Sequence, residues 1–254
     1  AKLGQQGATR LVLDLRGNHG GFVQPAIRMA YEFLPGNRMV FYMQGRHSPR
    51  ENFISDGRGA HQSTPLIVLV DEQTASASEI FAGSMQDNDR ALIVGRRSFG
   101  KGLVQESIEF RDGSMLRLTI ARYYMPSGRC VQKPYTPGDF EEYEMDFINR
   151  IKSGELESGD SIKEHGKKYY TRLGRTVYSE NGITPDVFVP EQSELLTSYV
   201  KEASMKGLLV KYAYVYTNEN RKALSELKTS EEVAAWLKKH DVVDKFADYA
   251  NKNG

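Results

Sequence analysis

A serine and a lysine stand in two short segments whose surroundings suit covalent catalysis. Thr74–Ile80 (TASASEI) places Ser76 where an apolar strand gives way to a helix. A hydroxyl at such a corner is exposed, and the N–H groups of the helix start point towards the group it attacks. Ser98–Gly102 (SFGKG) holds Lys101 in a glycine-rich loop, where a poorly solvated amine can lose its proton. Together these segments predict a hydrolase in which Ser76 attacks and Lys101 accepts its proton.

The serine has two alternative interpretations. Ser76 could simply cap the following helix, because serine is a favoured N-cap residue. Ser78, two residues further on, could instead be the reactive hydroxyl. The small side chains of Ala75 and Ala77 leave room for a substrate backbone. That room favours Ser76 as the nucleophile.

The lysine segment is close to a phosphate-binding loop. Gly95–Lys101 fits the pattern G-x-x-x-x-G-K, but Gly102 stands where serine or threonine would hold magnesium, and a strand follows instead of a helix. These two departures exclude nucleotide binding. Residues at spacing two share one face of a strand, so Gln105 could orient the Lys101 amine by hydrogen bonding.

The glycine-rich loop Gly17–Gly21 contains a histidine. The glycines could simply form a tight turn. They could also let a substrate approach backbone N–H groups that act as an oxyanion hole. His19 is an alternative general base for Ser76, since histidine is the commonest residue in that role. The other histidines (His47, His61, His165 and His240) stand in polar contexts typical of surface residues.

The composition excludes several classes of protein. The net charge of +1 over 254 residues gives no reason to expect nucleic acid or a membrane surface as partner. No apolar run approaches the roughly 20 residues of an integral membrane segment. Cys130 is the single cysteine, which excludes an internal disulfide and a multi-cysteine zinc site. No metal-ligand motif is present, so we expect neither a metal nor another cofactor.

The apolar pattern predicts an α/β domain with helices on the faces of a mixed sheet. Helices are expected at 22–34 and 78–87, and 44–64 is expected to be a long surface loop. Leu66–Val70 is predicted to be a central strand buried on both faces. The other expected strands are 11–15, 39–43 and 91–95, followed by a hairpin of 103–110 and 114–125.

Three parts of the chain differ in character. Residues 1–190 are predicted to form the catalytic core, and 191–254 a helical C-terminal extension. Within the core, 133–181 is rich in charge, glycine and tyrosine, which predicts a solvated insertion, helical between about 141 and 152. A capping box at Thr229–Glu232 predicts a helix start in the extension.

Several motifs, in order, resemble the tail-specific or carboxy-terminal processing serine peptidases. The resemblance covers about residues 8–132, and a later segment, 182–189, resembles the G-I-x-P-D stretch of the same family. The segments that carry it are Asp14–Gly21, Thr74–Ile80, Gln86–Asp87, Phe99–Gln105 and Tyr124–Arg129.

The resemblance implies a role for each site residue. It implies Ser76 as the nucleophile of a serine endopeptidase, Lys101 as its neutral-amine base, and Gln105 as the residue that positions Lys101. An oxyanion hole of backbone N–H groups is implied at Gly20, Gly21 and Ala77.

The resemblance also implies a crotonase/ClpP-like spiral of mixed β-sheet and helices, and a location in the periplasm or cell envelope, although this chain shows no signal peptide. Protein or peptide substrates, cut near their C-termini, are the implied partners. Whether the protein forms a homo-oligomer stays open. The family usually carries a PDZ domain upstream, and none precedes this core, so we expect the chain to be a fragment. His19 stands where the family usually has glycine or proline.

Two other functions are weighed against the peptidase. A catalytically silent domain that binds peptide C-termini would not need Ser76, Lys101 and Gln105 together. A crotonase-like enzyme acting on acyl thioesters would not need the serine and lysine pair.

Overall fold

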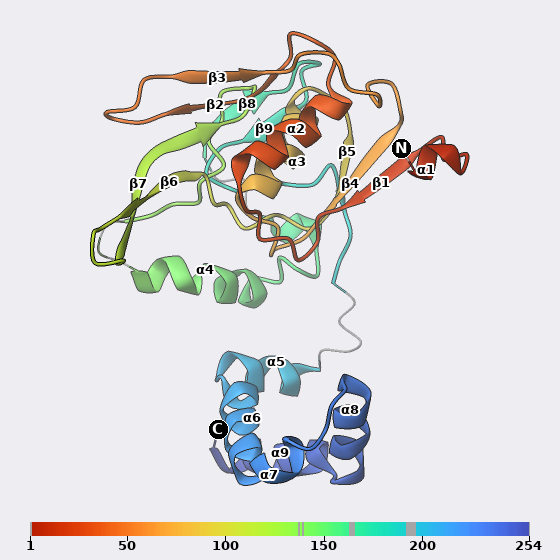
Figure 1. The fold of residues 1–254 in the computed structure, drawn as a ribbon, viewed down its shortest axis with the longest axis vertical. Helices are drawn as coiled ribbons and strands as arrows, with labels where there is room; N and C mark the ends of the chain where they lie inside the picture. The colour runs from red at the N-terminus through yellow and green to blue at the C-terminus, as the bar shows by residue number, and fades with distance from the viewer. Residues whose placement is uncertain (1, 137, 139, 163–165, 192–196, 254) are drawn as a thin grey trace. The chain divides into compact units, whose positions relative to one another are not determined.

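The computed structural model describes residues 2–136, 138, 140–162, 166–191 and 197–253. The chain divides into two compact units, Ala1–Pro190 and Glu191–Gly254. The first unit contains two four-stranded sheets and the second is helical (Figure 1). The prediction of a mixed α/β fold with a helical C-terminal part is confirmed.

The first sheet is parallel. Its strand order is β1-β4-β5-β10, and consecutive neighbours run in the same direction. The short helix α1 (Lys2–Gln5) precedes this sheet. The strands are β1 (Leu11–Asp14), β4 (Leu66–Val70), β5 (Leu92–Gly95) and β10 (Val187–Phe188).

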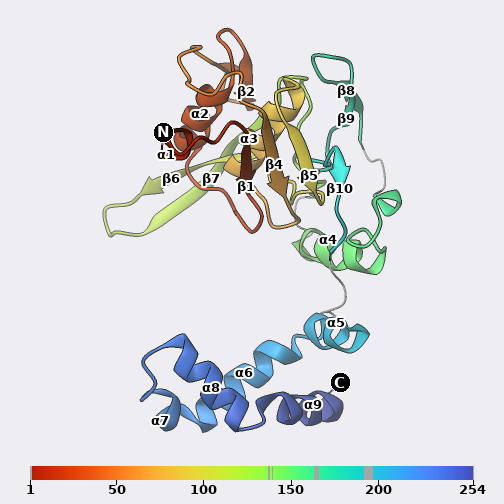
Figure 2. The same ribbon diagram turned by 90° about the vertical axis from the view of Figure 1, so that its right-hand side faces the viewer.

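The second sheet is antiparallel, with the order β3-β2-β7-β6. Its strands β6 and β7 form a long hairpin that projects from the unit (Figure 2). The hairpin turn contains Gly113 at φ 82°, which suits glycine. The strands are β2 (Met39–Gln44), β3 (Glu51–Ile54), β6 (Leu103–Glu109) and β7 (Met115–Tyr124).

Two helices, α2 (Val23–Phe33) and α3 (Ala77–Asp87), lie between the sheets (Figures 1 and 2). The main core joins all three layers, because Phe81 of α3 packs with Val68 of β4 and Phe41 of β2 in one buried cluster. Burial of such side chains stabilises the unit by about 1.5–3 kcal/mol each. The core therefore fixes α3, which begins directly after Ser76.

Two details of the predicted strands are wrong. The stretch 44–64 is not wholly loop, because β3 pairs with β2; Phe53 stacks on Phe41 with ring centroids 4.4 Å apart, while most of β3 is exposed. β4 is central, but it is not buried on both faces. Ile67 is 36% exposed, and its neighbours Val12 and Leu92 are exposed as well, because α2 and α3 both pack on the opposite face.

The segment 133–181 differs from the expected solvated insertion. Its helix α4 (Phe140–Lys152) is close to the predicted range. However, Lys133, Arg150 and Glu155 are 4–6% exposed, since their charges are paired inside the unit. The segment also contains a 3-10 turn, η1 (Gly159–Ser161), and the small hairpin of β8 (Lys168–Tyr170) and β9 (Thr176–Tyr178).

The second unit is built of helices around an aromatic cluster. Tyr212 packs against Tyr216, Phe246 and Tyr249, and the Thr229–Glu232 capping box is present at the start of α8. Within the described residues, no helix is both long and apolar enough to cross a membrane. The helices are α5 (Ser198–Met205), α6 (Leu208–Glu219), α7 (Arg221–Leu224), α8 (Ser230–Lys239) and α9 (Val242–Asn253).

Candidate active site

Ser76 occupies a sharp turn between β4 and α3. Its backbone has φ 58° and ψ −121°, a conformation that costs a non-glycine residue on the order of 1–3 kcal/mol. The residue is half-buried and immediately precedes the first residue of α3. Such a turn presents a serine hydroxyl above the helix N-terminus, where the helix dipole favours developing negative charge. Strain of this kind persists only where neighbouring groups hold it.

A buried carboxylate holds the turn and joins it to the lysine loop (residues 96–102). Glu79 accepts hydrogen bonds from the N–H groups of Ser76 at 2.9 Å, Gly100 at 2.7 Å and Lys101 at 2.8 Å. The Ser98 hydroxyl donates a fourth at 2.5 Å. Burial raises the pKa of Glu79, while these hydrogen bonds favour its ionised form. One side chain therefore fixes the backbone of both candidate catalytic residues.

A phenol makes a second connection between the same two residues. The Tyr123 hydroxyl lies 3.2 Å from the Ser76 carbonyl oxygen and also contacts the Lys101 carbonyl oxygen. Tyr123 is 1% exposed, and burial raises its pKa well above the ordinary value. The hydroxyl thus stays protonated and can donate to either carbonyl.

The loop 17–21 packs directly against the serine turn. Asn18 Oδ1 accepts hydrogen bonds from the Ser78 hydroxyl and from Gly20 N–H, both at 2.9 Å, and the Asn18 carbonyl accepts from Ala75 N–H at 3.0 Å. A Cβ on Gly20 would lie 2.5 Å from the Ala75 oxygen and 2.9 Å from Ser76 Cβ. Glycine is therefore required here, and the Ser78 hydroxyl is already engaged.

The predicted oxyanion donors differ in availability. Gly20 N–H donates to Asn18 Oδ1. Gly21 and Ala77, in contrast, donate to no acceptor within the described part of the chain. These two N–H groups therefore remain the candidates for the predicted oxyanion donors.

Ser76 and Lys101 line one cleft of about 410 Å³, together with Gln105 and His19. The structure thus brings the predicted nucleophile, base and positioning residue to one cleft with His19, whereas Ser78 does not line it. Within the described residues no hydrogen bond joins Ser76 Oγ to Lys101 Nζ, or Lys101 Nζ to Gln105. Catalytic hydrogen bonds are often long in the absence of substrate.

The other described histidines do not line this cleft. His61 stacks on Phe33 and contacts the Thr64 hydroxyl, and His240 stacks on Trp236. His47 is exposed, and His165 lies outside the described residues.

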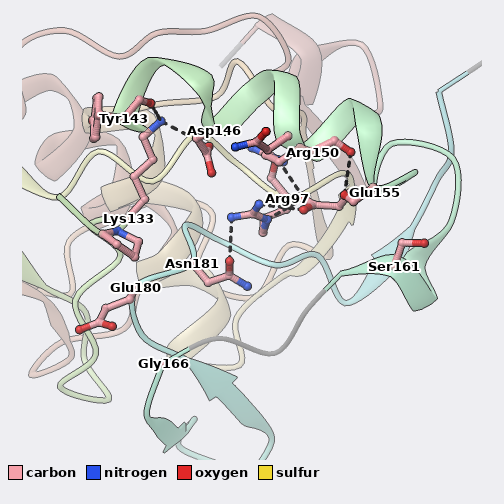
Figure 3. Close-up of a pocket in the computed structure, with 13 residues that line it drawn as sticks. Arg97, Lys133, Tyr143, Asp146, Arg150, Glu155, Ser161, Gly166, Glu180 and Asn181 are labelled. Carbon is pink, nitrogen blue, oxygen red and sulfur yellow. Dashed lines mark hydrogen bonds and ion pairs between the residues drawn. The ribbon is translucent and has the colours of Figure 1, made fainter. Parts of the chain in front are cut away.

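A buried cluster formed by Arg97, Arg150 and Glu155 holds the lysine loop from the side of α4 (Figure 3). Arg150 donates to the carbonyl oxygens of Arg97 at 2.5 Å and Ser98 at 3.1 Å. Glu155 accepts from Arg97 at 2.6 and 2.8 Å and from Arg150 at 2.9 Å. Burial favours a raised pKa for Glu155, but hydrogen bonds from Arg97 and the charge of Arg150 lower it. The cluster borders a cavity of about 400 Å³.

Lys133 makes a neighbouring contact between the loop and α4. Its Nζ lies 3.0 Å from the Tyr143 carbonyl oxygen and 3.3 Å from Asp146, above the rings of Phe99 and Tyr143. Its N–H donates to the Gly100 carbonyl oxygen at 2.9 Å. Burial lowers the pKa of Lys133, and Asp146 opposes that shift. The lysine loop is therefore held by α3 on one side and α4 on the other.

Two further sequence motifs meet in a fully buried ion pair. Arg129 lies 2.8 Å from Asp87 and 2.7 Å from the Gln86 side chain, and Gln86 also contacts Asp186 at 3.0 Å. These contacts join the end of α3 to the segments around 129 and 186. The motifs containing Asp87 and Arg129 thus support the fold around the site.

Sequence reasoning missed several positioning residues. The spacing of Ser76 and Glu79 is that of a capping box, and it could have indicated Glu79. Tyr123 sits in an ordinary strand pattern. The partners Arg97 and Glu155 are 58 residues apart, so no local pattern marks their pairing.

A family model described as peptidase family S41 matches residues 1–141 of this chain. The chain belongs to peptidase family S41. The matched residues include the serine turn, the lysine loop and the loop 17–21 described above. A second model, described as a family of unknown function, matches residues 199–254.

Relatives of this S41 chain carry processing-protease names. The carboxyl-terminal-processing protease of Synechocystis sp. is 44% identical over 132 residues, which are 52% of this chain and 30% of that protein. The chloroplastic carboxyl-terminal-processing peptidase 3 of Arabidopsis thaliana is 43% identical over 168 residues, covering 61% of this chain and 32% of that protein. The chain therefore spans about a third of the length of these relatives.

A solved structure is similar to this S41 chain as well. The photosystem II D1 C-terminal processing protease superposes with a TM-score of 0.52 at 28% identity, covering 77% of this chain and 38% of that one. The fold and the sequence thus lead to the same family.

Proposed function

We propose that this chain is the catalytic core of a serine endopeptidase of the C-terminal processing type. The observation that carries the proposal is the Glu79 carboxylate, which binds the backbone of both Ser76 and Lys101 and sets the two residues at one cleft. The names of the relatives supply the reaction class, hydrolysis of a peptide bond.

The proposed chemistry uses a serine and lysine dyad. Ser76 Oγ attacks the scissile carbonyl carbon while the neutral Lys101 amine takes the hydroxyl proton. The intermediate's oxyanion accepts hydrogen bonds from the N–H groups of Gly21 and Ala77. As the C–N bond breaks, the Lys101 ammonium returns that proton to the leaving amine, and an ester on Ser76 remains.

The second half of the reaction regenerates the enzyme. Lys101 takes a proton from water, the resulting hydroxide attacks the ester carbonyl, and the proton passes to Ser76 Oγ as the ester bond breaks. Gln105 lines the same cleft and is assigned the role of positioning Lys101. Gly20 supports the oxyanion donors by allowing the close approach of its loop to Ser76.

The wider setting also belongs to this proposal. Residues 1–190 would form the peptidase core, with a crotonase-like spiral, and 191–254 a helical extension. Protein or peptide substrates would be cut near their C-termini in the periplasm or cell envelope.

The test is mass spectrometry of an unfolded protein incubated with the chain and its variants. Cleavage by the parent chain that is lost in both Ser76→Ala and Lys101→Ala supports the dyad. Cleavage that survives Lys101→Ala but is lost in His19→Ala would assign the base to His19, which lines the same cleft. Cleavage that survives Ser76→Ala would contradict the proposal.

A further inference from the structure

A second groove continues from the cleft at Ser76. It has a volume of about 1370 Å³ and shares Lys101, Leu103, Gln105 and Arg117 with the cleft. The groove follows β6 and β7 and is bordered by Tyr143 of α4. A peptide extending from the scissile bond in this direction would lie along these walls.

The charges along this path have one sign. Arg46, Arg117 and Arg122 line the groove, and all three are exposed. Their side chains form no ion pair or hydrogen bond with another described residue. No aspartate or glutamate is among the described residues that line either the groove or the cleft. These exposed guanidinium groups are therefore available to the carboxylates of a ligand.

Apolar side chains make up the rest of the wall. Phe99, Leu103, Leu118 and Tyr135 line the same groove as the arginines. Guanidinium groups bind carboxylates through two parallel hydrogen bonds, and nearby apolar surface strengthens them by excluding water. The groove thus combines apolar contact with three exposed positive charges.

We propose that this groove selects peptide segments in which acidic side chains stand beside apolar ones. If the chain is the proposed peptidase, this preference leads to faster cleavage of acidic segments. The binding preference itself does not depend on cleavage. The groove opens into the Ser76 cleft, which favours a peptide over a nucleic acid as its occupant.

Binding is measured with the Ser76→Ala chain, which cannot form the acyl-enzyme. The probes are two fluorescein-labelled peptides of identical apolar sequence, one with three glutamates and the other with three glutamines. Fluorescence anisotropy at low ionic strength is expected to give about tenfold tighter binding of the glutamate peptide. The advantage should shrink as salt is added, because exposed ion pairs are screened.

Arginine variants in the same Ser76→Ala chain locate the effect. Arg117→Gln and Arg122→Gln should each reduce the preference for glutamate roughly two- to fivefold, the range of exposed ion pairs. Arg28→Gln is the matched control, because Arg28 is also exposed and lies on α2, away from the groove. It should leave the preference unchanged.

The outcomes separate this inference from the proposed function. Equal binding of the two peptides, or a preference unaffected by Arg117→Gln and Arg122→Gln, overturns the inference whether or not the parent chain cleaves. Tighter binding of a single-stranded oligonucleotide than of the glutamate peptide also overturns it. A glutamate preference located at these arginines in a chain that does not cleave supports the inference and counts against the peptidase alone.

Discussion

Glu79→Gln tests how the buried carboxylate positions the catalytic pair. In the native chain one Glu79 oxygen accepts from Ser76 and Lys101, and the other from Ser98 and Gly100. A glutamine can keep its oxygen towards Ser76 and Lys101. Its amide nitrogen then faces Ser98, whose hydroxyl can rotate and accept, and Gly100, whose N–H cannot.

The cost follows from that count. The Gly100 N–H loses its acceptor and the Ser98 hydroxyl must redirect its proton; a buried donor left without an acceptor costs about 1–3 kcal/mol. The midpoint of thermal unfolding should therefore fall by roughly 4–8 °C, as expected for about 2 kcal/mol in a unit of this size. The Gly100 end of the lysine loop relaxes, and a displacement near 1 Å at a catalytic group costs on the order of a hundredfold in rate. We expect kcat to fall about 10–100-fold with KM within about twofold.

The assay pairs thermal unfolding with steady-state cleavage of a fluorogenic peptide. Glu232→Gln is the matched control, because Glu232 is also a capping-box glutamate but is exposed in the second unit. It should change neither kcat nor the unfolding midpoint by more than a small amount. A Glu79→Gln chain with native kcat and native stability would refute the positioning role.

Three further predictions follow from the same contacts. Arg150→Met removes one partner of a buried ion pair and should destabilise the chain by about 3–5 kcal/mol in urea unfolding; a loss below about 1 kcal/mol would contradict the role of the cluster. The pKa of Glu155 is lowered on folding from 4.5, so its stabilisation is present above that pH and is lost as pH falls through the folded value; Glu155→Gln should flatten the acid limb of a stability-against-pH curve. Gly20→Ala should abolish cleavage, because Cβ would meet the Ala75 oxygen and φ is +86°; full activity in a folded Gly20→Ala chain would disprove the close approach.

The sequence predicts the parts of the fold that depend on local pattern. The continuous apolar run Leu66–Val70 is typical of a strand, and Ile80, Phe81 and Met85 recur at helical spacing, so local sequence identifies both elements. β3 was missed because it is an edge strand that places only Phe53 against the core. Its pairing comes from β2, which no feature within β3 reveals.

In the candidate site, too, local features could be predicted and contacts between distant segments could not. Ser76 and Lys101 could be found because each stands in a short motif with its own turn chemistry. The contacts that orient them are not local: Glu79 meets the lysine loop about 20 residues later in the chain, and Arg150 reaches it from α4. The charged composition of 133–181 suggested solvent exposure, yet pairing between opposite charges allows Arg150 and Glu155 to be buried.

Ser76 carries the acyl group in the proposed reaction, and trapping that ester tests the assignment. The parent chain is mixed with an unfolded substrate, quenched with acid within seconds and mapped by tryptic mass spectrometry. We expect the peptide containing Ser76 to gain the mass of an acyl fragment, and neither Ser76→Ala nor Lys101→Ala to accumulate it. An acyl group trapped on another residue, or cleavage that persists in the Ser76→Ala chain, would contradict the assignment of Ser76 as the nucleophile.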